Sequence, residues 1–296
     1  MKITYKNPVS EGGDPFVLYH DGKYYLYATT CSDQGYIIRV SDDLVNWHEE
    51  GFCLEKKDVL GEKNFWAPEV MFHNGLFYMA YSADWHLGIA VSDSPTGPFK
   101  QEEKKWACSE QAIDGSFFKD DDGKIYLYYV HQTSNGRYIN QIYAAQMNDD
   151  LTGIIEETER LLIDPCEDWE VRERARTAEG PFVLKNNGKY YLTYSVNDFQ
   201  SVYYSVGCAV SDSPLGPFKK LKGNPILKRS EFVNGTGHHS FTRTEDGQII
   251  CVYHTHNSPT VVNPRKICID KAEFGTNELG EETIIIHGPT HTEQTL

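Results

Sequence analysis

Five copies of one hairpin pattern run along this chain, and few folds can be built from such copies. Each copy has an apolar strand, a turn that contains glycine, and a second strand rich in tyrosine, as in Gly13–Tyr27. Glycine suits these turns because it accepts a positive φ at no steric cost. The turns lie roughly 50 to 65 residues apart, at Gly22, Gly75, Gly123, Gly188 and Gly247. This repeat predicts an all-β protein, a five-bladed β-propeller with four-stranded blades around a central funnel.

The segments between the hairpins also repeat. The pattern AVSDSP, any residue, GPF occurs at 90–99 and again at 209–218, each time after a tyrosine-rich strand. Inner and outer halves therefore recur in register, which is typical of blades. Proline and glycine are spread at blade-sized intervals and are not gathered in one linker. We therefore expect residues 1–296 to form a single propeller domain.

The net charge and the cysteines limit which binding partners and which cell compartment we expect. The chain has 28 Lys and Arg against 43 Asp and Glu, a net charge of −15. Such a chain repels phosphate, so we expect neither nucleic acid nor a membrane as a partner. Seven cysteines are scattered without a CxxC pair, which favours reduced thiols in a cytosol. The first residues contain no apolar signal segment, so we predict a cytoplasmic protein.

Acidic residues occupy similar places in several copies. Asp14 lies eight residues before its turn glycine, while Asp114, Glu179 and His238 each lie nine residues before theirs. In a propeller the matching ends of the innermost strands converge, so these side chains are predicted to share one mouth. Taken singly, Asp-Pro, Asp-Gly and Glu-Gly are also ordinary turn sequences. Three carboxyl groups at one mouth suit glycosidic bond cleavage, which needs an acid and a base.

The motifs GDPFV, WAPEV, IDGSFF, AEGPFV and GTGHHSF together resemble glycoside hydrolase family 43. The resemblance implies a five-bladed propeller that acts on β-xylosides and α-L-arabinofuranosides with inversion. It implies that Asp14 is the general base and Glu179 the general acid. It also implies that Asp114 orients the acid and raises its pKa by like-charge repulsion.

Further site residues follow from the same resemblance. Arg265 is expected to reach the sugar and the base. His238 is expected to touch a divalent metal, most commonly calcium, or its water shell, with His239 as the alternative if the register is off by one. A buried, hydrogen-bonded histidine without metal is the other interpretation of His238. Trp66 is expected to form an aromatic wall of the sugar pocket or to pack between blades.

Three more aromatic residues are candidates for the mouth. Trp85 is predicted to lie beside the same opening. Phe199 and Trp169, both in loops, are candidates for the side of the leaving group.

The predicted function is that of an exo-acting, inverting β-D-xylosidase with α-L-arabinofuranosidase side activity on xylo- or arabino-oligosaccharides. A dedicated α-L-arabinofuranosidase or an arabinanase is the alternative within the class. A non-catalytic sugar-binding propeller is the alternative of another class, although it has no need of all three acids. Many family β-xylosidases carry a second β-sandwich domain over the site, and this chain shows none. One arrangement that would close the site is a homo-oligomer in which a neighbouring subunit covers it.

Overall fold

The protein is built almost entirely from β-strands. The computed structural model describes residues 3–134, 138–173 and 175–296. Within these ranges the helical elements are two short 3₁₀ turns, η1 (Lys56–Asp58) and η2 (Glu156–Thr158). None of the described helical segments has the length and apolar character needed to cross a membrane. The prediction of an all-β protein is confirmed.

Each repeated sequence pattern forms an antiparallel hairpin. The pairs are β3 (Gly13–His20) with β4 (Lys23–Thr29), β7 (Trp66–His73) with β8 (Leu76–Ala83), β10 (Ala112–Lys119) with β11 (Ile125–Ser134), β14 (Arg176–Asn186) with β15 (Lys189–Val196), and β18 (Gly237–Arg243) with β19 (Ile249–Thr255).

Further strands extend each hairpin outward. They are β5 (Gly35–Ser41) and β6 (His48–Glu55), β9 (His86–Ser92), β12 (Tyr138–Gln146) and β13 (Arg160–Ile163), β16 (Ser205–Ser211) and β17 (Lys219–Lys220), and β20 (Lys266–Thr276) and β21 (Glu282–Ile286). The strands β1 (Thr4–Tyr5), β2 (Ser10–Glu11) and β22 (Gln294–Thr295) lie near the ends of the chain. β1 pairs with β22, so the two ends of the chain are paired with each other. β2 pairs with β20, which joins the N-terminal segment to the sheet of the last hairpin.

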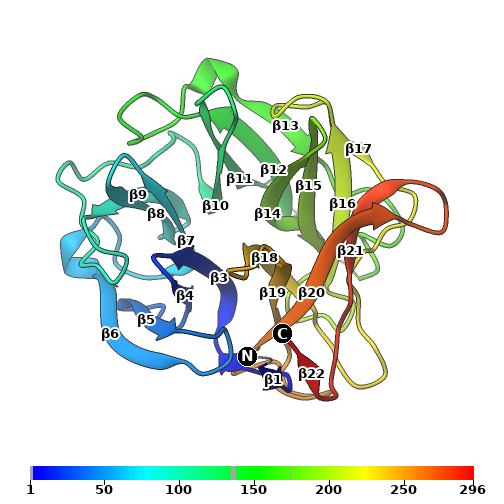
Figure 1. The fold of residues 1–296 in the computed structure, drawn as a ribbon. Helices are drawn as coiled ribbons and strands as arrows, with labels where there is room; N and C mark the ends of the chain where they lie inside the picture. The colour runs from blue at the N-terminus through cyan, green and yellow to red at the C-terminus, as the bar shows by residue number, and fades with distance from the viewer. Residues whose placement is uncertain (1–2, 135–137, 174) are drawn as a thin grey trace.

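The hairpins are arranged around a common centre (Figure 1). The first strand of each hairpin (β3, β7, β10, β14 and β18) lies nearest that centre, and the later strands lie progressively farther out. The N- and C-termini lie close together at the lower edge of this view. The matching ends of five inner strands therefore face one another across the middle of the molecule.

Every inner strand begins with the same backbone irregularity. Its register against the second strand shifts, and one residue within the shift has a positive φ. These residues are Asp14 (52°), Ala67 (45°), Asp114 (58°), Gly180 (53°) and His238 (43°). A bulge of this kind re-aims a side chain and is common beside active sites. Left-handed backbone at four non-glycine residues is strained, so the surrounding structure must hold it in place.

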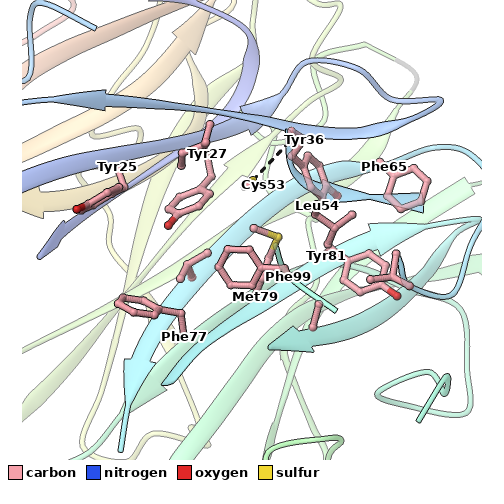
Figure 2. Packing of buried hydrophobic residues seen from close by; sticks show 14 of the residues in the cluster. Tyr25, Tyr27, Tyr36, Cys53, Leu54, Phe65, Phe77, Met79, Tyr81 and Phe99 are labelled. Carbon is pink, nitrogen blue, oxygen red and sulfur yellow. Dashed lines mark hydrogen bonds between the residues drawn. The ribbon is translucent and has the colours of Figure 1, made fainter. Parts of the chain in front are cut away.

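The hydrophobic core lies between neighbouring sheets. Figure 2 shows the cluster between the sheet of β3–β6 and that of β7–β9, where tyrosine and phenylalanine side chains from both sheets face one another. Phe65 stacks on Tyr81 with ring centroids 6.1 Å apart. Each fully buried aromatic side chain of this kind contributes about 1.5–3 kcal/mol through removal of apolar surface from water.

The buried tyrosines also fix the backbone through their hydroxyl groups. Tyr36, fully buried, donates to the backbone oxygen of Trp66 at 2.9 Å. Tyr81 donates to the backbone oxygen of Leu60 at 2.9 Å. Burial of a tyrosine is favourable only if its hydroxyl finds such a partner. The core therefore holds the start of β7 in place through the backbone of Trp66.

Candidate active site

The ends of the inner strands bring most of the predicted site residues together. Asp14, Asp114 and His238 occupy the same position, the positive-φ residue of the bulge, and all three line one cavity at the centre. Gly180 and Ala67 hold that position in the other two inner strands. The prediction that these strand starts share one mouth matches this geometry, while the chemical roles of the residues stay predictions.

Glu179 lies one residue before the position in the hairpin that the repeat predicts for it. In its hairpin the bulge position is Gly180, and Glu179 matches Gly13, Trp66, Ile113 and Gly237 of the other repeats. The turns explain the miscount. The hairpins of β3 and β14 turn in two residues, whereas Lys119 pairs with Ile125 and Arg243 with Ile249, across longer turns. Counting nine residues back from the turn glycine Gly188 therefore reaches Glu179, one residue before the bulge position Gly180.

Asp14 is clamped by four side chains. The Arg265 guanidinium donates to both carboxylate oxygens, from Nη1 to Oδ1 at 2.5 Å and from Nη2 to Oδ2 at 3.1 Å. Thr29 donates from Oγ1 to Oδ2 at 2.6 Å, and His238 Nδ1 lies 3.2 Å from Oδ1. The backbone N–H of Asp14 donates to His254 Nδ1 at 3.2 Å. These contacts fix the carboxylate in one orientation.

Asp14 is held ionised. Burial opposes ionisation, but the positive charge of Arg265 outweighs it and keeps the pKa of Asp14 far below its ordinary value. The imidazole of His254 is itself kept neutral because burial, followed by the charge of Arg265, lowers its pKa. Asp14 is therefore ionised, which a proton acceptor must be.

Arg265 lies against the backbone of Gly13. A Cβ on Gly13 would sit 1.9 Å from the guanidinium carbon, so any larger residue would push Arg265 away from Asp14. The other face of the guanidinium covers the Phe199 ring, 4.9 Å from its centroid. Phe199 therefore lies on the side of Arg265 and Asp14, and it holds the arginine in place by a cation–π contact.

Glu179 is held protonated. Its Oε1 accepts a hydrogen bond from the Tyr204 hydroxyl at 2.7 Å. Burial, followed by the like charge of Asp114, raises the pKa of Glu179 well above its ordinary value, although the Tyr204 bond acts in the opposite direction. Asp114 also has a raised pKa, first because of burial and then because of Asp14, while the Gly180 N–H bond to its Oδ2 at 3.2 Å lowers it. The two carboxyl groups therefore titrate as a pair that retains a proton.

Two tryptophan rings lie together near the start of β7. The rings of Trp66 and Trp85 meet edge to face with centroids 4.9 Å apart. Trp85 is 37% exposed, and Trp66 precedes Ala67, whose N–H donates to Thr29 Oγ1 at 2.9 Å. The prediction that both tryptophans belong to the mouth stays a prediction. A half-exposed indole face suits the apolar face of a sugar ring.

Trp169, the other loop aromatic predicted for the leaving-group side, packs between two sheets, and its predicted role stays untested. Its ring packs beside Tyr194, with centroids 6.3 Å apart, and against Gly207 in the core between β10–β13 and β14–β16. The sequence placed Trp169 in a polar loop, but that loop folds back over the outer strands. Residue 174, in the same loop, lies outside the described residues.

The histidines do not complete a metal cage. Among the residues that the structure describes, no group of three or more His, Cys, Asp or Glu side chains is placed to hold a metal ion. His238 Nδ1 faces Asp14, and the central cavity measures about 20 Å³, room for about one water molecule. His239 is buried, its Nε2 lies 2.6 Å from Thr193 Oγ1, and burial lowers its pKa to about 3.

The described side chains alone do not supply the six to eight oxygen ligands that calcium takes, so water would have to provide most of its shell. Calcium binding stays a prediction, and no step below uses a metal ion. Rates in chelator-treated and in calcium-supplemented buffer test it, since a calcium-dependent increase would confirm the prediction.

Three residues of the site were missed in the sequence. Thr29 and His254 lie at the ends of second strands, and Tyr204 lies just before β16. Tyr204 is fully buried and stacks on His254 with ring centroids 5.4 Å apart. For Thr29 and His254 a signal was present, because equivalent positions near the ends of the second strands hold Thr29, Ser82, Ser195 and His254, but it becomes visible only once the hairpins are aligned by structure.

Comparison with known proteins agrees with this geometry. A family model described as "Glycosyl hydrolases family 43" matches residues 5–279. A crystal structure of a thermostable family-43 glycoside hydrolase is 41% identical with a TM-score of 0.89, covering 98% of each chain. A structure titled endo-1,4-β-xylanase from Bacteroides thetaiotaomicron is 39% identical with a TM-score of 0.87, covering 96% of this chain and 97% of that one. These likenesses show the β-propeller fold.

The curated relatives carry the names of glycosidases. A protein named β-xylosidase from Xylanibacter ruminicola is 28% identical, covering 81% of this chain and 86% of its own length. Other relatives carry the names of xylosidases, arabinofuranosidases and a β-D-galactofuranosidase.

Proposed function

The chain belongs to glycosyl hydrolases family 43, and from that premise we propose that it is an exo-acting, inverting β-D-xylosidase that also releases α-L-arabinofuranosyl groups. It is a glycosidase with a saccharide substrate of the xylan or arabinan kind. The finer assignment draws its support from the site and from the names of the relatives.

One observation carries the proposal. The mouth holds two carboxyl groups whose environments separate their pKa values, with Asp14 kept ionised by Arg265 and Glu179 kept protonated by burial and by Asp114. Groups separated in this way are the acid and the base of such a site. The Trp66–Trp85 pair offers an apolar surface to a sugar ring.

The proposed mechanism uses these groups in named roles. Asp14 takes a proton from a water molecule, which attacks the anomeric carbon of the bound sugar. Glu179 gives its proton to the leaving oxygen, so the glycosidic bond breaks as the new C–O bond forms. Asp114 stays ionised next to Glu179 and favours the protonated acid in the ground state. Arg265 and Thr29 hold Asp14 in one orientation throughout.

We also propose that the five hairpin units are five blades of a closed ring, which residues 1–296 form as a single catalytic domain. A buried cluster that joins Tyr24 and Leu26 of the first unit with Ile250, Val252 and Ile269 of the last supports this closure. Such a ring is what brings strand starts from distant parts of the chain to one mouth.

A substrate panel tests the proposed activity. Release of p-nitrophenol from the β-D-xyloside, α-L-arabinofuranoside and β-D-galactofuranoside is compared with release of xylose from xylo-oligosaccharides. We expect the β-D-xyloside to be turned over fastest and xylose to be removed one unit at a time. Proton NMR of the first product is expected to show the inverted anomer. A dominant arabinofuranoside rate would favour the dedicated arabinofuranosidase, and internal cleavage of xylan or arabinan would exclude the exo mode.

Absence of turnover on the whole panel, with sugar binding retained, would support the non-catalytic propeller. The cytoplasmic location, the absence of nucleic-acid and membrane partners and the association of subunits stay predictions.

A further inference from the structure

The inner strands are linked by a repeated hydrogen bond that has one exception. In four junctions the N–H of the bulge residue donates to the side chain at the end of the preceding unit's second strand. The pairs are Ala67 N to Thr29 Oγ1 (2.9 Å), Asp114 N to Ser82 Oγ (3.0 Å), His238 N to Ser195 Oγ (2.8 Å) and Asp14 N to His254 Nδ1 (3.2 Å). A buried N–H needs such a partner, so this bond supports each strained bulge.

The junction between β11 and β14 breaks the pattern. The equivalent second-strand residue is Val130, which pairs with Ile113 as Thr29 pairs with Gly13. Its side chain is fully buried and has no acceptor. The N–H of Gly180 donates instead to Oδ2 of Asp114 at 3.2 Å. At the other four junctions the backbone N–H of the bulge residue donates to a hydroxyl group or an imidazole. At this junction it donates to a carboxylate of the site.

We propose that Val130 is a positioning residue for the acid: by offering no acceptor, it directs the Gly180 N–H to Asp114 and so keeps the shared proton on Glu179. The inference rests on the proposed function. A donor bound to the Asp114 carboxylate favours its ionised form. Because Asp114 and Glu179 share a proton, whatever favours charge on Asp114 favours the proton on Glu179.

Other groups near Asp114 and Glu179 also affect the pKa values of the pair, but they do not replace the effect of the Gly180 bond on Asp114. Asp14 and Asp198 add negative charge near Glu179, and Tyr204 donates to Glu179 Oε1. Arg265 adds positive charge near Asp114. Among the hydrogen bonds described for the Asp114 carboxylate, the Gly180 bond alone comes from a backbone donor. It is therefore the contact that a change at Val130 would redirect.

A matched pair of variants tests the inference. Val130→Ser and Val130→Ala leave the same space and differ only in a hydroxyl oxygen, which in Ser can accept the Gly180 N–H as Ser82 and Ser195 accept theirs. We expect Val130→Ser to lose about tenfold in kcat/KM relative to Val130→Ala on a substrate with a poor leaving group, such as xylobiose. On a dinitrophenyl glycoside, which needs no acid, the two variants should agree within about twofold.

The amide proton of Gly180 gives a readout that needs no activity. In the wild type and in Val130→Ala its NMR shift is expected to follow the titration of the Asp114–Glu179 pair, and in Val130→Ser it should not. Equal rates for both variants on xylobiose, or an unchanged Gly180 titration in Val130→Ser, would overturn the inference. A wild type that cleaves no glycoside would refute the proposed function alone, since the Gly180 titration would still decide the role of Val130.

Discussion

The starts of β14 and β7 each hold a carboxyl group with a raised pKa, yet the two regions differ in what surrounds it. Glu179 is partly accessible at the mouth, bonded to Tyr204 and close to the charge of Asp114. Glu69 is buried, and its Oε1 accepts from Ser116 Oγ at 3.1 Å and from the Phe117 N–H at 2.7 Å. Burial raises the pKa of Glu69 to about 8.

This comparison shows that a raised pKa alone does not identify a general acid. Burial is the first cause in both regions. Glu179 precedes the bulge of its strand and is partly accessible, whereas Glu69 follows Ala67, is buried beside the central cavity and accepts from the backbone of a neighbouring strand. Access to a leaving group separates the two, and position along the bulge decides that access. A substitution of Glu179 should therefore change activity more than stability, and a substitution of Glu69 should change stability more than activity.

The largest expected effect is that of Asp14→Asn. Asparagine fills the same space but cannot take a proton from water, so kcat should fall by about 10³-fold or more on glycosides with poor and with activated leaving groups alike. Initial rates on both substrate types measure it, with a thermal melt to verify folding, because Arg265 loses its charged partner. Retention of more than a tenth of the activity would remove Asp14 as the base.

Glu179→Gln should be nearly as severe, but for one substrate type only. The amide cannot protonate the leaving oxygen, so turnover of xylobiose should fall by about 10³-fold. A dinitrophenyl glycoside should lose about tenfold or less because its leaving group departs unprotonated. If both substrates lost the same factor, Glu179 would not be the acid, and the contrast with Glu69 would disappear.

Tyr204→Phe should have an intermediate effect and a distinctive pH profile. The hydroxyl donates to Glu179 and favours its ionised form, so its removal raises the pKa of Glu179 further. The acid then stays protonated to higher pH, and the alkaline limb of kcat/KM should move up by about one pH unit. We also expect about a tenfold lower rate at the optimum, because the carboxyl group loses its fixed orientation.

Tyr194→Phe is the matched control for that experiment. Tyr194 is equally buried and donates to Glu170 Oε1 at 2.9 Å, away from the mouth. It should lower stability by about 1–3 kcal/mol and leave the alkaline limb in place. An alkaline limb that moves in both variants, or in neither, would contradict the role assigned to Tyr204.

The smallest effect on activity is expected from Glu69→Gln, at less than about twofold in kcat/KM. Its effect should appear in stability. Because the pKa of Glu69 is raised, the folded state holds a proton that the unfolded state releases, so wild-type stability falls as pH rises from about 4.5 to about 8. Glutamine carries no such proton and keeps an oxygen for Ser116 and Phe117.

Denaturant unfolding at several pH values checks this last prediction. The wild type should lose up to ~1.4 kcal/mol per pH unit over that range from this group alone, and Glu69→Gln should lose less. Parallel curves for the two proteins would show that Glu69 does not titrate there. A large loss of activity would place Glu69 in the site and break the comparison.

Much of the site was predictable because it follows the repeat. Asp14, Asp114 and His238 recur at one position relative to the hairpin, and the structure places them on equivalent bulges. Glu179 was found by its motif but assigned the wrong phase, since turn length changes the count without changing the strand. The packing of Trp169 against Tyr194 could not be predicted, because a polar loop gives no sign of the surface it will cover. Tyr204 carried no signal, since its neighbours in space lie in other units.

The sequence by itself determined the local elements: apolar and tyrosine-rich strands of fixed period, turns where glycine accepts a positive φ, and acidic residues at strand starts. Only the tertiary structure decided which of those acids is ionised and which keeps its proton. That outcome depends on burial and on charges contributed by distant segments, as when Arg265 meets Asp14 and Tyr204 meets Glu179. Electrostatic energy depends on separation in space and on access to water, and neither is written in the order of residues.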